Sequence, residues 1–150
     1  MPKLSINDFQ AEQCNIFYEM AFDFYKYAEP EKEIGLNQLS NTFNNCINKS
    51  PYIRGVFICC DEVIAGYALL TFTYSNEYGG LIVFIDELYI KGNYRKSGLA
   101  SYCISSVISE YTHKAKYIEL IVKKENFAAI KLYERFGFSA NNYLSMGKGL

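Results

Sequence analysis

The fold is decided by the stretch Asp86-Glu87-Leu88-Tyr89-Ile90-Lys91-Gly92-Asn93-Tyr94-Arg95-Lys96-Ser97-Gly98-Leu99-Ala100. It predicts a buried strand, a short loop, and an Arg-x-x-Gly-x-Ala motif that opens a helix. Such a junction offers free backbone N–H groups and the positive end of a helix dipole. The small residues at positions 98 and 100 let an anion approach the main chain closely. We therefore expect a phosphate or pyrophosphate site here.

A second motif follows further along the chain, Asn126-Phe127-Ala128-Ala129-Ile130-Lys131-Leu132-Tyr133-Glu134-Arg135-Phe136-Gly137-Phe138. Together the two stretches resemble the GNAT superfamily of acyl-CoA-dependent N-acetyltransferases. The pattern of that family is Leu-x-Val, a short loop, Arg-x-x-Gly-x-Gly/Ala, and later Asn-x-x-Ala-x-x-Leu-Tyr-x-x-x-Gly-Phe. Here Leu88-x-Ile90, Arg95-x-x-Gly98-x-Ala100 and the second motif occur in that order and at that spacing. The resemblance covers residues 53–149.

The resemblance implies a mixed α/β (α+β) fold. Its central sheet is mostly antiparallel and splayed at the central strands, with helices on both faces. We expect one domain over residues 1–150, which is a usual single-domain length. The sequence departs from the family pattern at Gly92, where Pro is frequent, at Lys96, where Gly is common, and at Ala100, which replaces a second Gly. None of these changes removes a backbone donor, so phosphate binding is still expected.

The resemblance also assigns coenzyme contacts, with acetyl-CoA as the co-substrate. The backbone of Leu88, Tyr89 and Ile90 would run beside the pantetheine arm, and an N–H near Ile90 could polarise the thioester carbonyl. Asn126 would either hydrogen-bond the coenzyme arm or only cap its helix. The pyrophosphate would lie on residues of the loop and the helix start: Arg95, Lys96, Ser97, Gly98, Leu99, Ala100 and Ser101.

Three side chains are candidates for catalysis. Tyr133 matches the tyrosine that protonates the leaving thiolate in the family, although a core tyrosine is the alternative. An amine must lose a proton before it attacks, so a base is also needed. Asp86 and Glu87 end the apolar strand, and strand alternation places them on opposite faces. We favour Glu87 as the base, directly or through water, with a structural carboxylate paired to a Tyr or Arg as the alternative.

Composition limits the binding partners and the cell compartment that we expect for this protein. The net charge is −1, so we expect no bulk attraction to nucleic acid or to a membrane. The first nine residues are too polar for a signal peptide. The five cysteines form no Cys-x-x-Cys pair, and we interpret them as buried reduced thiols of a cytoplasmic protein. No metal site is expected. A surface rich in Tyr and Phe would suit a homodimer.

Charge is distributed unevenly along the chain. Residues 1–90 contain 5 Lys and Arg against 12 Asp and Glu, whereas residues 91–150 contain 10 against 4. Coenzyme A is polyanionic and an amine acceptor is cationic at neutral pH, so the two halves suit the two ligands. Chance drift of surface charge is the alternative.

Periodicity predicts the order of the elements. The predicted helices span residues 8–27, 36–47, 99–111 and 126–136, the last with Asn126 as N-cap and Gly137 as terminator. The predicted strands span residues 54–60, 63–73, 81–90, 117–122 and 143–149, with a hairpin turn at Asp61-Glu62.

Two functions fit these patterns. The first is an acetyl-CoA-dependent N-acetyltransferase that acts by direct attack of a primary amine. Its acceptor would be a small cationic amine, or alternatively a protein N-terminus or lysine side chain. The second is a non-catalytic acyl-CoA-binding domain. The combination of Tyr133 with a carboxylate at the strand end favours the enzyme.

Overall fold

The computed structural model describes residues 1–150 and is built around one five-stranded sheet in the order β1-β2-β3-β4-β5. The strands are β1 (Leu4–Asp8), β2 (Ile53–Cys60), β3 (Val63–Ser75), β4 (Gly80–Ile90) and β5 (Tyr117–Leu120). Neighbours from β1 to β4 are antiparallel, and β5 runs parallel to β4. This is the mixed, mostly antiparallel sheet that the sequence predicts.

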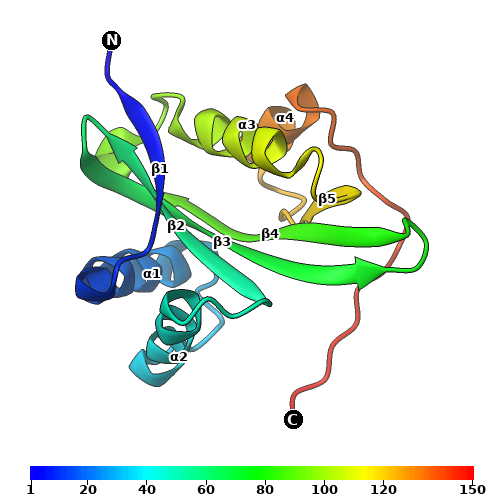
Figure 1. Cartoon of the computed structure of the whole chain (residues 1–150), viewed down its shortest axis with the longest axis horizontal. Helices are drawn as coiled ribbons and strands as arrows, with labels where there is room; N and C mark the ends of the chain where they lie inside the picture. Colours follow the sequence, from blue (N-terminus) through cyan, green and yellow to red (C-terminus); the bar gives the residue numbers. More distant parts are fainter.

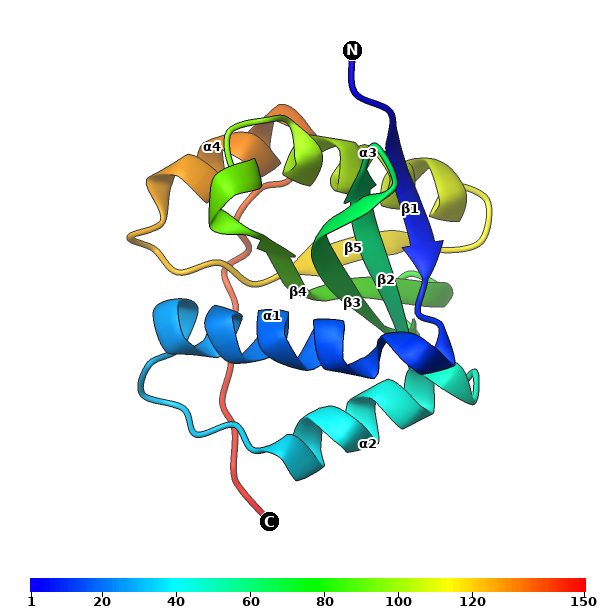
Figure 2. The same cartoon turned by 90° about the vertical axis from the view of Figure 1, so that its left-hand side faces the viewer.

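Helices cover both faces of the sheet (Figures 1 and 2). The helices α1 (Cys14–Ala28) and α2 (Leu36–Ile47) lie on one face. The helices α3 (Leu99–Tyr111) and α4 (Phe127–Arg135) lie on the other. Each face has its own buried cluster of 11 residues. The α1 side is rich in aromatic rings, and the α3 side is mainly aliphatic.

The β3–β4 pairing contains a bulge at Asp86. Leu69 pairs with Glu87 and Leu70 pairs with Ile85, so Asp86 is an extra residue on β4. A bulge changes which face the following side chains occupy. Ile85 packs in the cluster below α3, whereas Glu87 hydrogen-bonds to tyrosines on the α1 side. Simple alternation therefore breaks between Ile85 and Glu87, which point to opposite faces although they are two residues apart.

The sheet is splayed between β4 and β5. β5 pairs only with Ile82–Ile85, so the end of β4 from Asp86 to Ile90 has no neighbour on that side. Lys91 donates its N–H to the carbonyl of Ala65 on β3 at 2.8 Å. Backbone groups alternate along a strand, so those of Leu88 and Ile90 point away from β3 into the splay.

The structure corrects the sequence-based elements near both ends. Residues 4–8 form the edge strand β1, and the first helix begins at Cys14 rather than at residue 8. The five-residue alternation of β1 is too short to stand out. β5 ends at Leu120, and residues 143–149 form no strand in this chain because nothing pairs with them. All five cysteines are free, but only Cys59 and Cys103 are fully buried.

Candidate active site

The N-terminus of α3 forms a cradle of backbone donors. The first intrahelical bond runs from the N–H of Tyr102 to the carbonyl of Gly98 at 2.9 Å. The N–H groups of Leu99, Ala100 and Ser101 therefore have no acceptor within the helix, and no side chain caps it. Together with the helix dipole, these donors favour an anion.

Two backbone conformations shape this cradle. Gly98 has φ +83°, and a Cβ added there would meet no protein atom within 4 Å. Lys96 has φ +60°, which is unusual for a residue with a side chain. The family pattern commonly has Gly at position 96, and the positive φ supplies the physical reason. Lys96 adopts the same turn with some strain and adds an ammonium group beside the cradle.

Arg95 and Ser97 have local roles in the loop. Arg95 donates its Nε–H to the carbonyl of Ile90 at 2.9 Å, and its guanidinium lies 5.8 Å from the centre of the Tyr89 ring. Ser97 donates its hydroxyl to the carbonyl of Tyr94. Ser97 therefore stabilises the turn, and its side chain is not part of the cavity lining.

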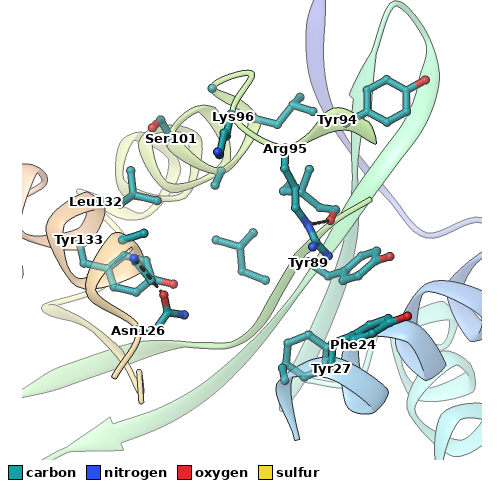
Figure 3. Close-up of a pocket in the computed structure, with 18 of the residues that line it drawn as sticks. Phe24, Tyr27, Tyr89, Tyr94, Arg95, Lys96, Ser101, Asn126, Leu132 and Tyr133 are labelled. Atoms are coloured by element: carbon teal, nitrogen blue, oxygen red, sulfur yellow. Dashed lines mark hydrogen bonds between the residues drawn. The ribbon is translucent and has the colours of Figure 1, made fainter. Parts of the chain in front are cut away.

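A cavity of about 750 Å³ lies between the cradle, β4, α1 and α4 (Figure 3). We call it the large cavity. Its volume is in the range of cofactor sites. It brings together eleven of the fourteen site residues predicted from the sequence: Leu88, Tyr89, Ile90, Arg95, Lys96, Gly98, Leu99, Ala100, Ser101, Asn126 and Tyr133.

Tyr133 and Asn126 lie on the same wall of the large cavity, the wall formed by α4 (Figure 3). The hydroxyl of Tyr133 points toward the cavity and has no hydrogen-bond partner in the protein. Burial raises the pKa of Tyr133, so the phenol stays protonated at neutral pH. Asn126 caps α4, because its Oδ1 accepts the N–H of Ala129 at 3.2 Å. Its side-chain N–H groups remain available to a ligand.

The two predicted carboxylates line a second, small cavity of about 310 Å³. Glu87 accepts hydrogen bonds from Tyr25 of α1 at 2.6 Å and from Tyr67 of β3 at 2.7 Å. Burial raises the pKa of Glu87, and the two tyrosine donors oppose that rise. Burial also raises the pKa of Asp86, opposed by the charge of Lys32.

The small and large cavities adjoin each other. Six residues line both: Phe24, Tyr27, Ala28, Leu88, Asn126 and Tyr133. The boundary between them therefore includes Tyr133 and Leu88 of the unpaired edge of β4. A long ligand in the large cavity and a short ligand in the small one would meet there.

The two cavities carry opposite charge. The large cavity has Arg95, Lys96 and Arg135 in addition to the free N–H groups, against the single carboxylate of Asp23. That carboxylate already accepts the hydroxyl of Tyr89. The small cavity has three carboxylates against one cation: Glu29, Asp86 and Glu87 against Lys123. The uneven charge predicted from the sequence thus reappears in the site, although Lys123 comes from the basic half.

Sequence reasoning missed several lining residues. Phe24 and Tyr27 project from α1 toward the cavity opposite Tyr133 (Figure 3). Tyr25 and Tyr67 hold Glu87, and they lie far from it in sequence. The sequence predicted a helix over residues 8–27 but not which of its residues would line the site.

The fold and the donor-lined large cavity have a geometry suited to a phosphorylated coenzyme. The sequence model described as "Acetyltransferase (GNAT) family" matches residues 14–138, and the chain belongs to this family. Acetyl-CoA is the co-substrate of the family, and the cradle and the free edge of β4 fit it. No helix combines the length and the apolar character needed to cross a bilayer.

Known proteins are similar over different extents. The chain is 29% identical to a spermine/spermidine N(1)-acetyltransferase of Bacillus subtilis (strain 168) over 97 residues. These aligned residues cover 62% of this chain and 64% of that protein. The chain thus spans less than two thirds of that relative's length. A possible acetyltransferase from Clostridium difficile 630 has a TM-score of 0.83 at 15% identity, with 98% and 97% of the two chains covered.

A solved structure with a bound ligand has the same fold. It is AAC(6')-Iy in complex with a bisubstrate analogue, CoA-S-monomethyl-acetylneamine. Its TM-score is 0.80 at 14% identity, with 99% of each chain covered. At such identity the likeness shows the fold alone.

Proposed function

We propose that this protein transfers the acetyl group of acetyl-CoA to the primary amine of a small, cationic acceptor by direct attack. One observation carries the proposal. A cavity with a phosphate cradle adjoins a cavity with three carboxylates, and Tyr133, whose hydroxyl has no partner in the protein, lines both. We further propose that residues 1–150 act as one domain in the cytoplasm, where its free thiols would stay reduced.

The coenzyme would lie in the large cavity. Its pyrophosphate would take the N–H groups at the start of α3, with Lys96 nearby. Its pantetheine arm would run along the free edge of Leu88 and Ile90, like an added strand. The N–H of Ile90 is then a donor for the thioester oxygen, where negative charge develops during attack.

The acceptor would lie in the small cavity, where its ammonium is attracted by Glu29, Asp86 and Glu87. Glu87 takes one proton from the ammonium, and the neutral amine attacks the carbonyl carbon. The N–C bond forms and the C–S bond breaks. Tyr133 gives its proton to the leaving sulfur and regains one from the acetylated nitrogen. The net products are the amide, free coenzyme A and one proton.

The names of one relative and of one protein with the same fold are consistent with this acceptor class. The relative is named as a spermine/spermidine acetyltransferase, and the protein with the same fold, AAC(6')-Iy, is named as an aminoglycoside N-acetyltransferase. Both names describe molecules with several amines. A polyamine is therefore the acceptor class that we place first, and the three carboxylates of the small cavity fit it.

The proposal is tested by thiol release from acetyl-CoA with a panel of amines. The panel includes spermidine, an aminoglycoside, a simple alkylamine and a lysine-containing peptide, and mass spectrometry identifies the acetylated product. We expect turnover with the polycationic small molecules and little with the peptide. Preference for the peptide would favour a protein acetyltransferase. A rise in melting temperature with acetyl-CoA but no turnover on any amine would favour a non-catalytic binding domain.

A further inference from the structure

The small cavity contains a primary ammonium that belongs to the chain itself. Lys123 is the single cation among the residues that line this cavity. Its Nζ lies 3.9 Å from a carboxylate oxygen of Glu29 and 3.9 Å from one of Glu31. Glu29 lines the cavity as well, whereas Glu31 does not. One of the three carboxylates that we assign to the acceptor is therefore paired with a lysine of the protein.

These ion pairs join two segments that are far apart in the sequence. Glu29 and Glu31 belong to the connection between α1 and α2, residues 29–35, and Lys123 belongs to the connection between β5 and α4, residues 121–126. The two connections lie on the same side of the molecule (Figure 2). No backbone hydrogen bond joins them. Because Lys123 contacts one carboxylate in the small cavity and one outside it, its ammonium lies at the mouth of that cavity.

Both contacts are weak enough for a ligand to replace. The two distances exceed the range of about 2.7–2.9 Å that is typical of charge-assisted hydrogen bonds. The side chains of Lys123 and Glu31 are 50% and 61% exposed, so water screens their attraction. Glu29 is the more buried partner, and Lys32 lies 3.7 Å from it as well. An exposed ion pair of this kind contributes little to stability, so another ammonium can take its place.

The lysine side chain is chemically similar to one end of the acceptor that we propose. It presents a primary ammonium on a flexible four-carbon stem, and a polyamine presents its terminal ammonium groups on short alkyl chains. Glu29 therefore has the charge to bind either one. An alkylamine with a single nitrogen differs, because that nitrogen is the reacting atom and lies near Glu87. It leaves no second ammonium for Glu29.

We propose that Lys123 is an internal counter-ion of the acceptor site, and that the second ammonium of a polycationic acceptor displaces it from Glu29. This inference rests on the proposed function. The reacting amine lies near Glu87, and the ammonium at the other end of the acceptor replaces Lys123 at the mouth of the small cavity. Lys123 then keeps only its contact with Glu31. Lys123 is thus a specificity-determining residue that weakens the binding of polycations and not that of monoamines.

NMR titration of spermidine and of butylamine tests this competition. Coenzyme A without an acetyl group saturates the protein, so that no turnover occurs. We expect Lys123→Met to lower the Kd for spermidine roughly two- to fivefold, the range of an exposed ion pair, and to leave the Kd for butylamine unchanged. Lys123→Arg keeps the charge and should resemble the wild type.

Lys124→Met is the matched control, because it removes the same charge from the neighbouring residue. Lys124 is exposed and lines neither cavity, so both affinities should stay at their wild-type values. The side-chain ammonium signals give a second readout that is independent of affinity. Spermidine should shift the signal of Lys123 and not that of Lys124, and butylamine should shift neither.

The outcomes separate this inference from the proposed function. An equal or higher Kd for spermidine in Lys123→Met, or a Lys123 signal that saturating spermidine does not move, would overturn the inference alone. Spermidine that binds as expected but is not acetylated in the amine assay would overturn the proposed function alone, because the competition is measured without catalysis. Failure of spermidine to bind to the wild type and to Lys123→Met would overturn both.

Discussion

The large and small cavities are built from different parts of the polypeptide. The phosphate end of the large cavity is made mainly of backbone: the N-terminus of α3, the left-handed turn at Gly98 and the free edge of β4. The small cavity is lined by residues from α1, β4, the segment after β5 and α4. A backbone site needs a local sequence pattern, whereas a side-chain site needs residues brought together over long distances. Ligand binding at the phosphate end of the large cavity should therefore tolerate side-chain changes that would alter ligand binding in the small cavity.

Removal of the Tyr133 hydroxyl should have the largest effect, because it lies where the two cavities meet. We expect Tyr133→Phe to lower kcat roughly 100- to 10,000-fold, the usual contribution of a general acid. The affinity for coenzyme A should change little, since the ring is kept. Steady-state kinetics and calorimetry measure the two quantities. Tyr52→Phe, at an exposed position outside both cavities, is the control. Unchanged turnover would assign Tyr133 to packing.

Substitution of the two carboxylates should separate their roles. We expect Glu87→Gln to lower kcat/KM roughly ten- to a hundredfold and to flatten its rise with pH, as loss of a base requires. Asp86→Asn should mainly raise KM for a cationic acceptor. The pH dependence of kcat/KM for both variants is the measurement. If Asp86→Asn flattens the profile instead, then Asp86 is the base.

Loss of one tyrosine donor should move the pH profile by a smaller amount. The groups that face Glu87 are Tyr25, Tyr67, Asp86 and Glu29. The tyrosines donate to the charged carboxylate and so lower the pKa of Glu87. Removing one donor should raise that pKa. Tyr25→Phe should therefore shift the acidic limb of kcat/KM upward by about one pH unit, as expected for a hydrogen bond to a charged group. If the acidic limb does not move in Tyr25→Phe, the hydrogen bond between Tyr25 and Glu87 has only a structural role.

Relief of strain at Lys96 should have the smallest effect. Lys96→Gly removes strain of about 1 kcal/mol, partly offset by the freer unfolded chain, so the net stabilisation should be below about 1 kcal/mol. Loss of the ammonium should weaken coenzyme binding only a few-fold, as for an exposed ion pair. Lys49→Gly, at φ +55° outside the large cavity, should gain similar stability with no change in binding. If Lys96→Gly and Lys49→Gly change coenzyme affinity equally, the Lys96 side chain makes no contact with the coenzyme.

Much of this fold was predictable from the sequence, and the exceptions have physical reasons. The range of α2, the start of α3 and the cap at Asn126 follow from local periodicity and capping, and the structure confirms them. The strand β1 was missed because its signal is short and depends on pairing with distant β2. The strand predicted for residues 143–149 has no partner within the chain.

The candidate site shows the same division. The cradle residues were predicted because a contiguous motif builds them. The bulge at Asp86 was not, because it arises from pairing with β3 and leaves no mark in the strand's own sequence. The partners of Glu87 were not predicted either, since Tyr25 and Tyr67 are brought to it only by the fold.

The most direct test of a backbone-built coenzyme site is calorimetric titration of acetyl-CoA into two matched glycine variants. Gly98 and Gly137 have φ of +83° and +89°, and a Cβ at either meets no protein atom within 4 Å. Valine at either position should therefore cost similar strain, at least about 1–2 kcal/mol of stability. Only Gly98 lines the large cavity. We predict that Gly98→Val abolishes acetyl-CoA binding while Gly137→Val retains wild-type affinity. Wild-type affinity in a folded Gly98→Val variant would contradict the account.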